Sequence, residues 1–279
     1  MKQRIITSIG IAAVGIPILV FSQYIIFQIA LGALAAVAMY EALGALGLRR
    51  DLFLAIPAYL ITAAAPFCAY FVNKDWQINY ILVLCIAFFA YMMWTFGICV
   101  FRQGTLKFGD GVSVFALVVY ITVAFCALAL LRGMGDGTIG VLFLGLVFTA
   151  AFATDVFAYF TGYFFGKHKL IPKVSPKKTV EGAVGGIVFA TLAFLLYGVI
   201  VGLATDYTVN YLILLISGLL LSVISQIGDL TASLIKRERG IKDYGVIFPG
   251  HGGVLDRFDS VIAVSAPLMI ICLLFPPFV

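Results

Sequence analysis

Nine apolar runs, each long enough for a membrane-spanning helix, most strongly limit what this chain can fold into. A helix needs roughly 20 apolar residues to cross the hydrocarbon core of a bilayer. The runs cover approximately residues 5–21, 25–43, 52–72, 78–100, 112–131, 138–165, 184–204, 209–234 and 255–277. Hydrophobic residues make up 63% of the chain and charged residues 11%, against roughly 45–50% and about 25% in soluble domains. The sequence therefore predicts an all-α, polytopic integral membrane protein with about nine transmembrane helices, and it excludes an ordinary soluble domain.

The distribution of Lys and Arg predicts how these helices cross the membrane. If the N-terminus is cytoplasmic, fifteen of these residues fall in cytoplasmic segments, Lys74 and Arg132 fall on the other side, and Arg257 opens the last span. Such a bias is the positive-inside pattern of multi-pass membrane proteins. The basic residues are confined to particular loops, so the net charge of +5 does not indicate a nucleic-acid partner. We expect a multi-pass protein of the cell inner membrane with its C-terminus outside.

Two long polar loops, 166–183 and 235–254, then face the cytoplasm. Residues 1–140 are expected to form an N-terminal set of transmembrane helices, a scaffold that could also dimerise. Residues 141–279 are expected to form a C-terminal catalytic set that carries both loops. The active site should accordingly be intramembrane and open to the cytoplasm.

Four carboxylates lie within or at the start of predicted spans, all in the cytoplasmic half of the membrane: Asp155, Asp229, Asp256 and Asp259. Ionisable residues inside spans are costly and usually functional. Clustered carboxylates repel one another, and a divalent cation removes that repulsion. Oxygen ligands suit Mg²⁺, which completes its shell with water and substrate phosphate. The alternative is structural: Asp256 pairs with Arg257 or a loop Lys, and Asp155 is a buried hydrogen-bonding residue.

The two loops carry residue types that bind phosphate. In the first, Ser175, Lys177, Lys178 and Thr179 precede a predicted helix start, where free backbone N–H groups attract anions. In the second, Gly252 and Gly253 allow backbone N–H groups to approach an anion closely. His251 beside them could act as an acid or base, bind phosphate when protonated, or only bond to the helix start. A basic patch that senses anionic lipid is the alternative for the first loop.

These residues together resemble the phosphatidate cytidylyltransferases (CDP-diacylglycerol synthases) of bacterial type. The resemblance rests on Ser233-x-Ile235-Lys236-Arg237, Lys242-Asp243-x-Gly245 and Phe248-Pro249-x-His251-Gly252-Gly253-Val254-x-Asp256-Arg257-Phe258-Asp259. The segment from Asp155 to Gly166 and the run Ser175-Pro176-Lys177-Lys178-Thr179-x-Glu181-Gly182 resemble the preceding part of the family pattern. The detailed match covers roughly residues 150–260, and the first 140 residues match in hydropathy alone.

The resemblance implies transfer of the cytidylyl group of CTP to phosphatidate, giving CDP-diacylglycerol and diphosphate in phospholipid biosynthesis. It also implies a homodimer, and a paired-metal centre at Asp229 and Asp256 in which K⁺ can accompany Mg²⁺. The residues expected to act in catalysis are Asp229, Asp256, Lys236, Arg237 and His251. Those expected to bind substrate phosphate are Ser175, Lys177, Lys178, Thr179, Lys242, Arg257, Gly252 and Gly253. Those expected to bind metal are Asp229, Asp256, Asp259 and Asp155.

Two other functions remain open at this point. A nucleotide-dependent transferase acting on another lipid phosphate, of polyprenyl or archaeol type, would need similar chemistry and a different apolar groove. A cation-coupled transporter would also place Asp residues inside the membrane. The transporter explains the sequence less well, because the charges lie on one side of the membrane and are flanked by two phosphate-type loops.

Overall fold

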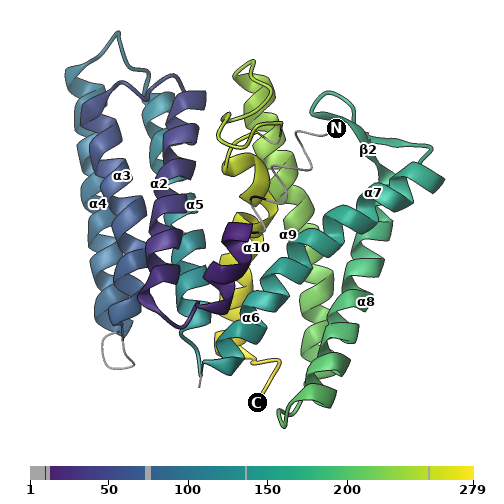
Figure 1. Ribbon diagram of the computed structural model, residues 1–279. Helices are drawn as coiled ribbons and strands as arrows, with labels where there is room; N and C mark the ends of the chain where they lie inside the picture. Colours follow the sequence, from purple (N-terminus) through teal and green to yellow (C-terminus); the bar gives the residue numbers. More distant parts are fainter. Residues whose placement is uncertain (1–9, 11–12, 73–76, 136, 251) are drawn as a thin grey trace. The chain divides into compact units, whose positions relative to one another are not determined.

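The computed structural model describes residues 10, 13–72, 77–135, 137–250 and 252–279 (Figure 1). Within them, eight helices are long and apolar enough to cross a membrane. This confirms the prediction of an all-α, multi-pass membrane protein. Residues 5–9 and 11–12 of the predicted first span at 5–21 lie outside the described residues, and its residues 13–20 are helical.

The chain divides into two compact units, and the first combines residues 1–133 with residues 241–257. Its helices are α2 (Ile25–Ala45), α3 (Leu52–Cys68), α4 (Gln77–Phe101) and α5 (Phe108–Arg132), with the short 3₁₀ turn η1 (Ala69–Phe71) after α3. α5 packs against α2, α3 and α4, and α2 also packs against α3 (Figure 1). Leu43, Leu54 and Phe125 are fully buried between them. The glycine-rich loop, residues 241–254, belongs to this unit.

The second unit combines residues 134–240 with residues 258–279. It contains α6 (Thr138–Phe148), the π-helical turn η3 (Thr149–Ala153), α7 (Thr154–Phe165), β1 (Lys169–Ile171), β2 (Ser175–Thr179), α8 (Val180–Ala204), α9 (Tyr211–Glu238) and most of α10 (Leu255–Leu274). α8 packs against both α7 and α9. The described chain ends in an extended pairing, in which Thr208 N–H donates to Val279 O at 2.7 Å.

Glycines allow α7 and α8 to lie very close together. A Cβ atom at Gly185 would overlap the Thr161 side chain, and one at Gly182 would overlap the Ala158 carbonyl. Small residues at helix contacts are the usual means of close packing in membranes, where dispersion forces hold helices together. This contact positions the chain that leaves α7 against the chain that enters α8.

Two boundaries differ from the sequence-based expectation. α9 continues to Glu238, so Lys236 and Arg237 lie on its last turn and not in a loop. Cations are favourable there because the last carbonyl groups of a helix carry partial negative charge. α8 begins at Val180, four residues before the predicted membrane span 184–204 and directly after Thr179, where a helix start was expected.

The first polar loop also contains a feature that the sequence did not reveal. Strands β1 and β2 pair as an antiparallel hairpin, with Lys169 opposite Thr179 and Ile171 opposite Ser175. The division into residues 1–140 and 141–279 as functional parts stays a prediction.

Candidate functional site

The lysine-rich hairpin is fastened at its base by one carboxylate. Glu181, in the first turn of α8, accepts hydrogen bonds from the backbone N–H groups of Lys167 at 3.1 Å and His168 at 3.2 Å. The same carboxylate lies 2.7 Å from Nδ1 of His168. The chain that leaves α7 is thereby tied to the start of α8, and β1 and β2 project from a fixed point.

Thr179 ends the hairpin and begins the helix. Its side-chain oxygen accepts a hydrogen bond from Gly182 N–H at 3.1 Å, the usual contact of a helix N-cap. The helix start predicted after Ser175–Thr179 is therefore confirmed. Thr179 is buried, so its hydroxyl is a structural group in this arrangement.

Lys178 turns inward from the hairpin and meets α9. Its Nζ lies 2.5 Å from Oδ2 of Asp229, and both side chains are about three-quarters buried, with 24% and 26% exposed. Apart from this ion pair, Nζ has no hydrogen-bonding partner among the described residues, although the atom is fully buried. An ammonium group has three donors, so this one can still bind an anionic oxygen. Lys177, the preceding residue on β2, is exposed.

Three of the predicted metal-binding carboxylates come together in the second unit. Asp155 and Asp259 both interact electrostatically with Asp229, and they interact with each other. Ser260 binds two of them: its hydroxyl is 3.2 Å from Asp155 Oδ2, and its N–H donates to Asp259 Oδ1 at 2.7 Å. The π-helical turn η3 directly precedes the helix that carries Asp155, and such turns are frequent at functional sites.

This acidic cluster (Asp155, Asp229 and Asp259) suits Mg²⁺ in the chemistry of its donors. Among the described residues, no group of three or more His, Cys, Asp or Glu side chains is arranged so that it could hold a metal ion. Mg²⁺ does not need one, because it commonly takes one or two carboxylates and fills its remaining positions with water and phosphate. Like charges held this close favour a cation, and Lys178 lies beside them.

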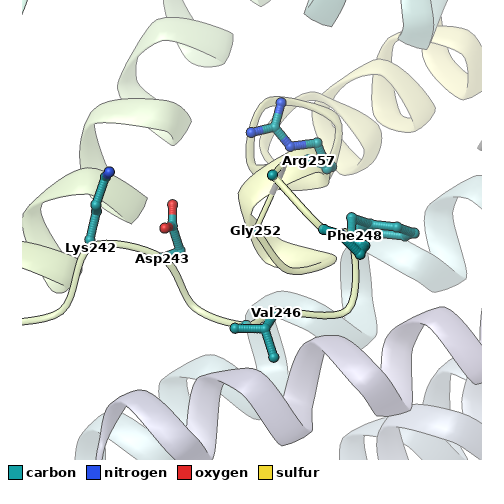
Figure 2. A pocket seen from close by; sticks show the side chains of 9 residues that line it. Lys242, Asp243, Val246, Phe248, Gly252 and Arg257 are labelled. Atoms are coloured by element: carbon teal, nitrogen blue, oxygen red, sulfur yellow. The ribbon is translucent and has the colours of Figure 1, made fainter. Parts of the chain in front are cut away.

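The glycine-rich loop lines an open cavity in the first unit. The cavity has a volume of about 500 Å³, within the range of small-molecule sites. Figure 2 shows Lys242, Asp243, Phe248 and Arg257 around it. The cavity thus offers two cationic side chains, one aromatic ring and the half-buried backbone of Gly252.

Glycine is required in the tight turn of this loop. Gly250 and Gly252 have φ of 78° and 85°, a region that side chains strongly disfavour. Phe248 N–H donates to Gly252 O at 2.9 Å and closes the turn. His251, predicted to act in catalysis, lies outside the described residues.

Asp256 organises the same loop. Its Oδ2 accepts hydrogen bonds from the N–H groups of Tyr244 at 2.7 Å and Gly253 at 2.9 Å. The second bond reaches back three residues, as in a capping box. The structure therefore shows a loop-holding contact for Asp256, which was predicted as a metal ligand, and its metal role stays a prediction.

The remaining predicted residues lie near the acidic cluster or in and around the hairpin, within the second unit. Lys236 interacts with Asp259 in the acidic cluster. Arg237 donates from Nε to the carbonyl of Val174 at 3.3 Å, so it contacts the tip of the hairpin. Ser175 lies at the start of β2 and is half-buried. Which of these side chains bind substrate stays a prediction.

Sequence reasoning missed Ser260 as a partner of the acidic cluster and Glu181 as the anchor of the hairpin. For Glu41, at the end of the predicted span 25–43, the sequence left open a solvated loop position or a supporting role behind the metal-binding side chains. A carboxylate near the end of the apolar run 25–43 was the available signal for Glu41. Its partners lie more than 200 residues away, so the sequence alone could not identify them.

The chain is similar to known proteins over its whole length. Residues 2–275 match the family model described as "Cytidylyltransferase family". A protein of Bacillus subtilis named phosphatidate cytidylyltransferase is 34% identical over 277 residues, covering 99% of this chain and 98% of the relative. One of the same name from Staphylococcus haemolyticus is 33% identical, covering 98% of this chain and 99% of the relative. One from Brucella abortus is 42% identical over 151 residues, which is 54% of each chain. This chain therefore belongs to the cytidylyltransferase family, as the sequence motifs of the two polar loops predicted.

Proposed function

We propose that this membrane protein is a phosphatidate cytidylyltransferase. A phosphate oxygen of phosphatidate attacks the α-phosphorus of CTP, a new P–O bond forms, and the α–β P–O bond breaks. The products are CDP-diacylglycerol and diphosphate. The relatives' names support the substrate pair. The observation that carries the proposal in the structure is the buried Lys178 ammonium beside three carboxylates, because it pairs a phosphate-binding cation with candidate metal ligands.

The chemistry needs positioning and charge neutralisation more than a protein nucleophile. The phosphatidate phosphate is already anionic, so no Ser or Cys has to be activated. Lys178 and Lys236 place positive charge next to the acidic cluster. Lys242 and Arg257 place positive charge around the cavity of the glycine-rich loop. Preorganised cations of this kind stabilise charge that develops on transferring phosphoryl groups.

We further propose Mg²⁺ as the cofactor, held by Asp229 with Asp155 and Asp259. Bound Mg²⁺ would polarise the phosphate oxygens and neutralise charge on the leaving diphosphate. The family resemblance adds Asp256 as a ligand and K⁺ as an accompanying ion. The chain's own contribution is to keep the carboxylates of the acidic cluster oriented, through Ser260 and the Lys178 ion pair.

The setting of the protein is also part of the proposal. The excess of Lys and Arg in alternate loops supports a protein of the cytoplasmic membrane with a cytoplasmic N-terminus and an outer C-terminus. A homodimer is proposed from the family resemblance. Phosphatidate would then reach the site from the cytoplasmic leaflet while its acyl chains stay in the bilayer.

A reconstitution assay tests the reaction. Purified protein in detergent is supplied with CTP labelled at the α-phosphate, phosphatidate and Mg²⁺, and we expect a labelled lipid and release of unlabelled diphosphate. A polyprenyl phosphate offered in place of phosphatidate tests the alternative transferase. Labelling of the polyprenyl lipid alone, or no labelled lipid from an intact protein, refutes the proposed function.

A further inference from the structure

Glu41 is a buried carboxylate and the only charged residue of α2. It lies near the end of α2, and its residue is 1% exposed. Removing a charged group from water is costly unless the group is hydrogen-bonded or paired. The structure supplies both kinds of compensation within the first unit, because Arg49 interacts favourably with Glu41 and two backbone N–H groups donate to it.

Those two donors belong to the end of the glycine-rich loop and the start of α10. Val254 N–H donates to Oε1 at 3.0 Å, and Leu255 N–H donates to Oε2 at 2.9 Å. The first N–H groups of a helix have no partner inside the helix. Glu41 therefore uses both oxygens to hold the first residues of α10 from a position 213 and 214 residues earlier in the chain.

The loop also packs directly on this carboxylate. A Cβ atom at Gly245 or at Gly253 would overlap the Glu41 side chain. Two separate points of the loop thus need to lack a side chain so that the backbone can lie against Glu41. Their φ values do not require glycine, since neither lies in the left-handed region. The close approach to Glu41 explains both glycines.

Asp256 completes the arrangement from within the loop. Its Oδ2 binds the N–H groups of Tyr244 and Gly253, so Glu41 and Asp256 together hold four backbone donors of one short segment. Lys242 and Arg257, at the two ends of this segment, line the cavity. A change in Glu41 is transmitted to both through the backbone.

We propose that Glu41 is a positioning residue for cytidylyl transfer: by binding Val254 and Leu255 it fixes the glycine-rich loop and the first turn of α10. The effect of Glu41 on catalysis rests on the proposed function, whereas its role in fixing the loop rests on the contacts alone. Glu41 touches no substrate in this scheme. It keeps Lys242, Asp256 and Arg257 in one geometry while the charge moves from the attacking to the leaving oxygen.

The test uses the full-length protein in detergent and the substitution Glu41→Gln, which preserves shape. The amide places an NH₂ group against one of the two backbone N–H donors, so one hydrogen bond is lost and a donor faces a donor. Hydrogen exchange measured on a peptide that covers residues 244–255 should become at least about tenfold faster, the equivalent of about 1.4 kcal/mol. The milder substitution Glu41→Asp should give a smaller increase, which keeps the test usable if Glu41→Gln is poorly folded.

Kinetics give the second measurement. Loss of a group that orients active-site residues typically costs about 10–100-fold in activity, and we expect this in kcat. The KM for CTP should stay within about threefold, because Lys242 and Arg257 attract the anion in a loosened loop as well, whereas the transition state needs exact geometry. Gln28→Leu is the matched control: Gln28 is buried in the same helix, and its side-chain oxygen has no hydrogen-bonding partner among the described residues.

Each result decides the inference. Unchanged exchange in Glu41→Gln, or faster exchange with unchanged kcat, overturns the positioning role. Equal effects in Gln28→Leu overturn it too, because they would indicate general loosening of α2. If the unsubstituted protein transfers no cytidylyl group, the proposed function fails, and the exchange comparison still decides whether Glu41 holds the loop.

Discussion

Replacing Lys178 by Met removes the cation that lies against the acidic cluster while keeping the length of the side chain. In the structure its Nζ is fully buried, 2.5 Å from Asp229 Oδ2, with donors to spare for a phosphate oxygen. Truncating one partner of a desolvated charge pair costs roughly 2–5 kcal/mol. Since about 1.4 kcal/mol corresponds to a tenfold change, and the site is about one-quarter exposed, we expect kcat/KM to fall on the order of 100-fold.

The same substitution should lower kcat/KM and at the same time strengthen the binding of the divalent cation. Without the ammonium group, Asp229 retains Asp155 and Asp259 as negative neighbours, so the acidic cluster attracts a divalent cation more strongly. The Mg²⁺ concentration for half-maximal activity should decrease several-fold while the KM for CTP increases. Steady-state assays that vary CTP at saturating Mg²⁺, and then Mg²⁺ at saturating CTP, measure the two effects separately.

Lys177→Met provides the matched control for this prediction. The two lysines are adjacent on β2, and adjacent strand residues point to opposite faces. Lys177 is exposed, so its loss should reduce kcat/KM by no more than about fivefold through weaker long-range attraction. Equal losses in both variants, or a Lys178→Met enzyme within threefold of the parent, would refute the assignment of Lys178 to the substrate phosphates.

Four further predictions concern the metal and the helix contacts. Asp229→Asn should reduce turnover by more than about a thousandfold without preventing membrane insertion, and near-normal activity would exclude Asp229 as a metal ligand. Chelation by EDTA should abolish activity, and added Mg²⁺ should restore it. Thr179→Val should cost about 1 kcal/mol of stability through loss of the N-cap, seen as a melting temperature lower by about 2–4 °C. Gly185→Val should destabilise by about 1–3 kcal/mol because it overlaps Thr161, whereas Gly97→Ala, with open space around it, should leave the melting temperature unchanged.

The fold class could be predicted from the sequence because one physical effect, the burial of long apolar helices in a bilayer, dominates it. Runs of about 20 apolar residues have few alternatives to a spanning helix. The ends of helices were harder to predict where charged residues are compatible with helical structure. Lys236 and Arg237 looked like loop residues, yet their positive charge stabilises the end of α9. Charge marks where a helix leaves the membrane, and it does not mark where the helix ends.

The site was readable where its residues are close in sequence. The glycine-rich loop could be recognised from its composition, and Thr179 was correctly placed before a helix. Contacts over long sequence separations were not readable, because one sequence carries no record of which polar residues meet. Glu41 and Val254 are 213 residues apart, and Glu181 looked like part of a phosphate motif although it binds the backbone at the hairpin base.

The π-helical turn between α6 and α7 has a consequence for how this protein tolerates insertions and deletions. A π turn holds one residue more than an α turn, and each residue of an α-helix adds about 100° of rotation. Deleting one residue from Thr149–Ala153 would convert this wide turn into a regular α turn, so the direction in which α7 presents its side chains would change little. Deleting one residue from the regular helix α6 would instead turn Asp155 by about 100° away from the side that faces Ser260. A change of length should therefore be tolerated far better inside this turn than in the regular helix on either side.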